Sequence, residues 1–282
     1  MILIDKKNNI NYDINVHMYI HDLNPVLINF GFFEIKWYSL AYILGILIGW
    51  WIAKKIIIFK IKNKIVFFDI ILFDDLITYI IISIILGGRI GYIIFYNPTY
   101  YYHNPIDILK IWQGGMSFHG GFIGVILGTY IFTQKNKINT FFCLDVVATV
   151  APIGIFFGRL ANFINGELYG KPSNSSWSVV FPEVDMLARH PSQIYEALLE
   201  GIILFSILIT VIFKKNIRIG LCSSLFMILY GFFRIFVEQF REPDPQIGYL
   251  FNLFSMGSVL SFIMILGGVF VYIKIRDNDI YK

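Results

Sequence analysis

The chain has 282 residues, of which 57% are hydrophobic and 15% are charged, whereas a soluble domain typically has about 45–50% apolar and about 25% charged residues. This composition excludes an ordinary soluble globular enzyme. The formal charge of +4, from 23 basic and 19 acidic residues, is too small and too dispersed to indicate a nucleic-acid partner. A transmembrane β-barrel is excluded because its strands alternate apolar and polar residues, while residues 38–59 are apolar on every face except near their end.

Seven apolar segments follow one another along the chain, and each has about the 20 residues that a membrane-spanning helix needs. The predicted spans are residues 38–58, 74–96, 115–133, 141–158, 191–213, 219–238 and 250–274. The sequence therefore predicts an all-α polytopic integral membrane protein with seven transmembrane helices, in which residues 1–282 form a single transmembrane domain. A small external head segment, residues 159–190, is expected between the fourth and fifth helices.

The basic residues of the connections predict the orientation, because cytoplasmic loops carry an excess of lysine and arginine. The connections after the odd-numbered helices contain 13 of them and the opposite side contains eight. The 13 are Lys54, Lys55, Lys60, Lys62, Lys64, Lys135, Lys137, Lys214, Lys215, Arg218, Lys274, Arg276 and Lys282. We therefore expect the N-terminus outside and the C-terminus in the cytoplasm.

A short list of ionisable residues lies inside the predicted spans or at their rims, although a charge at the bilayer centre costs at least about 2.5–3.5 kcal/mol. They are Arg89, His119, Arg159, Glu196, Glu200, Arg234 and Glu238. With a rise of about 1.5 Å per residue, Arg89 lies roughly 10 Å, and His119 and Arg234 roughly 6 Å, below the outer ends of their helices. The shared depth predicts one polar cavity open to the outer leaflet. A transporter would instead place its site near the midplane, between repeated halves.

The sixth span carries Tyr230, Arg234 and Glu238, followed by Arg241, at a spacing that projects all four side chains from one helical face. One interpretation is a salt bridge between Arg234 and Glu238 that only orders the bundle. The other is anion binding, because two arginines around one carboxylate leave a net positive charge, and guanidinium forks suit phosphate. The additional Arg241 favours the second interpretation.

Residues 158–170 form the most specific stretch of the sequence, GRLANFINGELYG. Arg159 and Asn162 are expected to share a helical face. The glycines that end the stretch permit a turn close to a ligand. For Asn165 and Glu167, helix capping and turn formation are an alternative to substrate binding.

His119 lies between Phe118 and two glycines at the start of the third span. Gly120, Gly124 and Gly128 form a stripe that close helix packing explains without a function. A histidine near the outer surface can approach a substrate and act as a general base near neutral pH. A serine nucleophile at Ser117 is disfavoured, since residues two apart on a helix do not face each other.

These motifs resemble those of the prolipoprotein diacylglyceryl transferase family, and the resemblance covers nearly the whole chain. The family signature falls on residues 158–170, and the family's essential histidine falls on His119. The other matching positions are Tyr38, Arg89, residues 189–193, Tyr230, Arg234, Glu238 and Arg241.

The resemblance implies a multi-pass enzyme of the bacterial cytoplasmic (inner) membrane whose active site faces the outer leaflet. Such an enzyme transfers the diacylglyceryl group of phosphatidylglycerol to the lipobox cysteine thiol of a prelipoprotein signal peptide. The reaction forms a thioether, releases glycerol phosphate and needs no cofactor or metal. It is the first step of bacterial lipoprotein maturation.

The resemblance also assigns roles to particular residues. The catalytic residues are expected to be His119, Tyr38, Arg234 and Glu238. The residues expected to bind phosphatidylglycerol are Arg159, Asn162, Asn165, Glu167, Gly170, Arg241, Arg89 and Tyr230. Tyr38, His119 and Glu238 are each candidates for the general base. The alternative class is a lipid transporter or lipid-binding scaffold, in which the same arginines hold a headgroup without chemistry.

Overall fold

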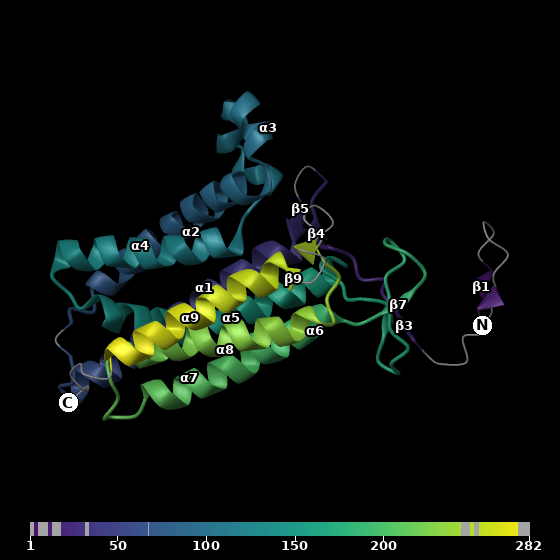
Figure 1. The fold of residues 1–282 in the computed structure, drawn as a ribbon. Coiled ribbons are helices and arrows are strands. Elements are labelled where there is room, and N and C mark those ends of the chain that lie inside the picture. Colours follow the sequence, from purple (N-terminus) through teal and green to yellow (C-terminus); the bar gives the residue numbers. More distant parts are fainter. Residues whose placement is uncertain are drawn as a thin grey trace.

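The computed structural model is a bundle of long helices with a small β-structure at one end (Figure 1). It describes residues 3–4, 11–12, 18–31, 34–66, 68–243, 249–250 and 254–275. The strands β3 and β7 lie at one end of the bundle, while the end of the described chain near residue 275 lies at the other end. We call these the head end and the far end.

Each predicted span contains a helix, although in the last one, residues 250–274, the helix begins only at Met256. The helices are α1 (Trp37–Lys62), α2 (Leu72–Tyr96), α3 (Pro98–His103), α4 (Phe118–Asn136), α5 (Thr140–Ile164), α6 (Ser192–Glu196), α7 (Leu204–Ile212), α8 (Leu221–Glu238) and α9 (Met256–Lys274). A π-helical segment, η3 (Ala197–Ile203), joins α6 to α7 in one continuous helix. Two short 3-10 helices, η1 (Pro105–Leu109) and η2 (Ile111–Gln113), follow α3.

Six helices of the described chain are long and apolar enough to cross a membrane: α1, α2, α5, the continuous helix Ser192–Ile212, α8 and α9. These helices support a polytopic membrane protein. The helix α4 occupies the third predicted span, but it has His119 in its first turn and ends with Gln134, Lys135 and Asn136, which make it less apolar. A seventh crossing and the orientation of the bundle therefore stay predictions.

Short strands complete the head end. In one sheet, β3 (Tyr19–Ile20) pairs in parallel with β6 (Val179–Val180), which pairs antiparallel with β7 (Ala188–Arg189). A segment before α1 thus joins the expected head segment, while α5 continues as a helix to Ile164. Three antiparallel pairs are formed by β1 (Leu3–Ile4) with β2 (Asn11–Tyr12), β4 (Val26–Asn29) with β5 (Glu34–Lys36), and β8 (Tyr249–Leu250) with β9 (Phe254–Ser255).

Arg189 holds the head segment together. Its guanidinium donates to both carboxylate oxygens of Asp185, at 3.1 and 2.5 Å, and to the carbonyl oxygen of Gly170 at 3.0 Å. The hydrogen bonds from Arg189 hold the pKa of Asp185 below its ordinary value. The contact with Gly170 ties the strand β7 to the loop that follows α5.

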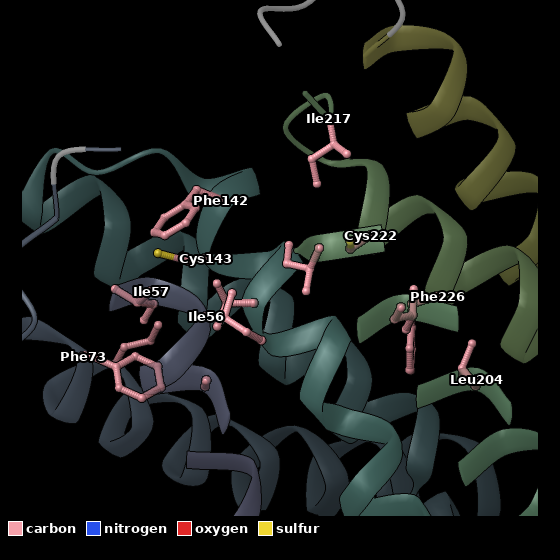
Figure 2. Packing of buried hydrophobic residues seen from close by; sticks show 14 of the residues in the cluster. Ile56, Ile57, Phe73, Phe142, Cys143, Leu204, Ile217, Cys222 and Phe226 are labelled. Atoms are coloured by element: carbon pink, nitrogen blue, oxygen red, sulfur yellow. The ribbon is translucent and has the colours of Figure 1, made fainter. Parts of the chain in front are cut away.

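The apolar core lies toward the far end of the bundle. Its members include the buried Ile56 and Ile57 of α1, Phe142 of α5 and Leu208 of α7. Figure 2 shows Ile57, Phe142 and Cys143 gathered on one side of this cluster. Because the apolar packing is concentrated at the far end, the buried polar side chains of the head end form a separate layer.

Glycines bring α2 and α4 into close contact, as the sequence pattern indicated. A Cβ atom on Gly124 would lie 2.1 Å from the carbonyl oxygen of Ser83, and one on Gly120 would lie 2.3 Å from that of Gly87. Both distances are far below van der Waals contact. The close approach holds the first turn of α4 against α2, where His119 is located.

Candidate active site

A cavity of about 340 Å³ opens at the head end of the bundle, between α2, α4, α5, α8 and the start of α9. Six of the expected site residues line it: His119, Arg159, Tyr230, Arg234, Glu238 and Arg241. They come from three helices and from the residues after α8, as expected for one shared polar cavity. Its remaining wall is mainly apolar and aromatic, with Tyr92, Tyr96 and Phe118 among its members.

Three of these residues are arginines that converge on Glu196, which is fully buried. Both Arg234 Nη1 and Arg241 Nη1 donate to Glu196 Oε1, the latter at 3.0 Å. On the other side, Arg159 Nε lies 3.1 Å from Glu196 Oε2. A single carboxylate therefore joins α5, α6, α8 and the segment after α8.

Two more glutamates complete what we call the arginine–glutamate cluster: Arg159, Arg234, Arg241, Glu196, Glu200 and Glu238. Glu200 accepts a hydrogen bond from Arg159 at 3.1 Å, and Glu238 Oε2 lies 2.8 Å from Arg234 Nη2. The sequence expectation counted only the carboxylate of Glu238 beside Arg234 and Arg241, whereas three arginines and three carboxyl groups meet here.

The sequence predicted Glu196 and Glu200 as ionisable residues of a span but did not indicate a role for them in the site. Their i, i+4 spacing could have indicated a common face. The helix adopts the wide π form from Ala197 onward, and Glu200 belongs to this segment. Such π segments are frequent at functional sites.

His119 occupies the first turn of α4 and lines the cavity. Its Nε2 is buried, and this atom has no hydrogen-bond partner among the described residues. The neighbouring Phe118 stacks on Tyr230 with ring centroids 5.1 Å apart, which closes this side of the cavity. An unpaired, buried ring nitrogen beside a cavity is available to accept a proton from a bound molecule.

A second polar group surrounds Tyr38 at the start of α1. The Tyr38 hydroxyl donates to Glu167 Oε2 at 2.9 Å and accepts a hydrogen bond from Asn162 Nδ2. None of these three residues lines the cavity. Asn162 thus faces α1, while Arg159, three residues earlier, faces Glu196 and Glu200. The two residues are three apart on one helix, so they project from neighbouring parts of its surface, but they contact different helices.

Comparison with known proteins decides the family. The sequence profile described as prolipoprotein diacylglyceryl transferase matches residues 25–274. A protein named phosphatidylglycerol–prolipoprotein diacylglyceryl transferase from Rickettsia bellii is 50% identical over 263 residues, covering 93% of this chain and 98% of its own. Its counterpart from Rickettsia typhi is 49% identical and is covered over its full length, with 93% of this chain. The chain belongs to the prolipoprotein diacylglyceryl transferase family.

Two further positions that match the family pattern, Gly170 and Asn165, have packing environments of their own. A Cβ atom on Gly170 would lie 2.4 Å from the carbonyl oxygen of His190 and 2.6 Å from that of Phe240, so no larger residue fits. Asn165 lies at the C-cap of α5, in agreement with the capping alternative. Neither residue lines the cavity.

Arg89 of α2, another expected lipid-binding position, contacts the loop that follows this helix. It is buried, with 4% of its surface exposed, and it is not among the residues that line the cavity. Its guanidinium donates to backbone carbonyls of residues 107–115. The position of Arg89 along α2 predicted that it would lie near the cavity. Its side chain instead points toward the loop of residues 107–115.

Proposed function

We propose that this chain transfers the diacylglyceryl group of phosphatidylglycerol to the lipobox cysteine of a prelipoprotein. One observation carries the proposal: His119, whose Nε2 has no hydrogen-bond partner among the described residues, and Arg159 line the same cavity among helices long and apolar enough to cross a membrane. The names of the family relatives give both substrates, phosphatidylglycerol and prolipoprotein. A base and cations around an enclosed space suit the transfer of a group from an anionic lipid.

The reaction balances with one proton. His119 Nε2 takes the proton of the cysteine thiol, because the thiolate is the nucleophile and a free thiol has a pKa near 8.5. The sulfur attacks the glycerol carbon that bears the phosphate, a carbon–sulfur bond forms, and the carbon–oxygen bond to phosphate breaks. The electron pair leaves with the oxygen of glycerol phosphate, and the proton held by His119 then passes to this product, which restores the neutral histidine.

Arginines stabilise the phosphate leaving group in this mechanism. Charge-assisted hydrogen bonds are strong in a cavity that excludes water. Arg159 is the most exposed arginine of the cluster, with 15% of its side chain accessible against 10% for Arg234 and 6% for Arg241. Arg159 therefore makes the first contact with the phosphate, while the ion pair with Glu196 fixes the position of the Arg159 guanidinium.

The geometry favours His119 over the other two candidate bases. The Tyr38 hydroxyl is engaged with Glu167 and Asn162 outside the cavity. Glu238 lines the cavity, but its carboxylate is engaged in an ion pair with Arg234 at 2.8 Å. Tyr38 and Glu167 then order the junction of α1 with the loop after α5, and Tyr230 supports the aromatic wall.

The test uses protein purified in detergent, phosphatidylglycerol labelled in its diacylglyceryl part, and a lipobox peptide. We expect the label to become covalently attached to the peptide cysteine, with one glycerol phosphate released per transfer. A peptide with serine in place of the cysteine is the control and should remain unlabelled. Headgroup-dependent lipid binding without a covalent product would overturn the proposal in favour of a lipid carrier.

We also propose that the head end faces the outside of the bacterial cytoplasmic membrane, which follows from the excess of basic residues at the far end. The native cysteines Cys143 and Cys222 are buried, so a single introduced cysteine can be labelled selectively. In intact spheroplasts, an impermeant thiol reagent should label Ser176→Cys, in the head segment, and should leave Lys215→Cys, at the far end, unlabelled until the membrane is opened. The opposite labelling pattern would invert this orientation.

A further inference from the structure

The connection between α2 and α4, residues 98–117, forms an arm of three short helices that projects from the bundle (Figure 1). It contains α3, η1, η2 and the turn that leads into α4. Several of its side chains are largely exposed, with Tyr102 at 83% and Trp112 at 76%. An arm with so little buried surface needs a specific anchor to keep a fixed position.

The anchor is Arg89 of α2, whose guanidinium is surrounded by backbone carbonyls of the arm. Its Nη1 donates to Gly114 at 2.6 Å and to Gly115 at 3.2 Å, and its Nε donates to Ile108 at 2.9 Å. Its Nη2 donates to Asp107 at 2.5 Å and to Lys110 at 3.3 Å. All three nitrogens of the guanidinium are therefore used by the arm. The fork of an arginine can satisfy such a set of acceptors, whereas a lysine ammonium acts from one point.

The same part of α2 also fixes the start of α4. The amide of Ser117 donates to the carbonyl oxygen of Gly88 at 2.9 Å, and the Ser117 hydroxyl oxygen accepts from the amide of Gly120 at 3.2 Å. Gly88 and Arg89 are consecutive, so two adjacent residues of α2 hold the turn and the helix cap on either side of Met116. His119 lies in the helical turn that this cap begins.

The packing around Gly115 leaves little freedom for this turn. Gly115 has a positive φ of 78°, a conformation that favours glycine. A Cβ atom at Gly115 would lie 2.7 Å from the ring of Tyr92 and 2.9 Å from Arg89 Nη1. Since Tyr92 lines the cavity, a shift of Arg89 or of the turn would reach both the cavity wall and His119.

We propose that Arg89 is a positioning residue for the transfer reaction: it holds the carbonyls of the arm and thereby sets His119 relative to the arginines of the cavity. This inference rests on the proposed function. It replaces the expected substrate contact of Arg89 with a role that acts through the first turn of α4. The lipid phosphate would not touch Arg89.

The test is Arg89→Lys, measured alone and together with His119→Gln. In the otherwise unchanged protein we expect kcat to fall by about 10–100-fold, as a small misplacement of a catalytic group can, with little change in the KM for phosphatidylglycerol. In the His119→Gln background, Arg89→Lys should cause little further loss, because coupled residues are not additive. Arg218→Lys, at the far end, is the matched control and should leave both constants unchanged.

Two results would overturn the inference. The first is an equal loss from Arg89→Lys in both backgrounds together with a lower melting temperature, which would indicate a merely structural residue. The second is a rise in the KM for phosphatidylglycerol without a loss of kcat, which would indicate a direct lipid contact. If the unchanged protein forms no covalent product, the proposed function itself has failed.

A physical measurement gives a second readout that does not depend on activity. A spin label at Leu109→Cys, which is 73% exposed on the arm, should become more mobile in Arg89→Lys and should not change in Arg218→Lys. Gly115→Ala offers a second route to the same displacement, and we expect it to lower kcat without raising the KM. A label of unchanged mobility in Arg89→Lys would contradict an anchoring role.

Discussion

Replacing His119 with glutamine should slow diacylglyceryl transfer by about 10²–10⁴-fold at neutral pH, the usual contribution of a general base. Glutamine is polar and of similar reach, but it cannot take the thiol proton. The deficit should shrink as the pH rises through the ordinary thiol pKa near 8.5, because the thiolate then forms without help. The transfer rate is measured against pH for both proteins, together with phosphatidylglycerol binding and the melting temperature in detergent.

His103→Gln is the matched control for this prediction. His103 is an exposed histidine of α3 whose Nδ1 contacts the carbonyl oxygen of Thr99 at 2.8 Å, outside the cavity. It should retain the unchanged rate at every pH. If His119 serves only to pack against Phe118, His119→Gln will lower the melting temperature and lipid binding together, and high pH will not restore the rate. A stable His119→Gln protein with an unchanged rate would move the base to Glu238 or Tyr38.

The sequence predicted the helices well because a physical length fixes them. A bilayer of about 30 Å needs about 20 apolar residues, and residues 74–96 and 219–238 match α2 and α8 within two residues. The shared cavity was also predictable. His119, Arg234 and Arg159 were expected to meet in one polar cavity although they come from different helices, and they do line one cavity.

The sequence could not give the rotation of each helix relative to its neighbours. The helical period relates residues within one helix, but packing decides which helix each side chain faces. Arg89 lies on a helix as predicted, yet its side chain points into the arm. Arg159 and Asn162 were expected to face one substrate, yet α5 lies between α1 and α6, so each contacts a different helix.

The sequence also does not show which residues pair with a buried charge. Arg234, Arg241 and Glu238, on α8 and the residues after it, suggested a positive site because they are the charged residues of one segment. Glu196 and Glu200 come from a different helix and contact the arginines across the interface. The number of charges in a span was therefore predictable, while their pairing depended on the tertiary structure.

Removing the carboxylate of Glu196 should destabilise the protein more than any other change to the arginine–glutamate cluster. Glu196→Ala leaves Arg159 Nε, Arg234 Nη1 and Arg241 Nη1 without their shared acceptor. Breaking a buried ion pair by removing one partner typically costs about 3–5 kcal/mol, since the other charge stays buried and uncompensated. We expect a fall in the free energy of unfolding of this size, together with loss of transfer.

Glu242→Ala is the matched control for this change, because Glu242 also pairs with an arginine. Its Oε2 lies 3.2 Å from Arg189 Nη1, but its side chain is 41% exposed, whereas that of Glu196 is fully buried. An exposed pair contributes about 0–1 kcal/mol. Unfolding in a detergent titration should therefore separate the two variants by at least about 2 kcal/mol.

Glu196→Gln keeps the shape and one acceptor oxygen but loses the charge, so its stability should lie between that of Glu196→Ala and the unchanged protein. Equal stability of Glu196→Ala and Glu242→Ala would show that the three arginines do not depend on Glu196 to remain buried.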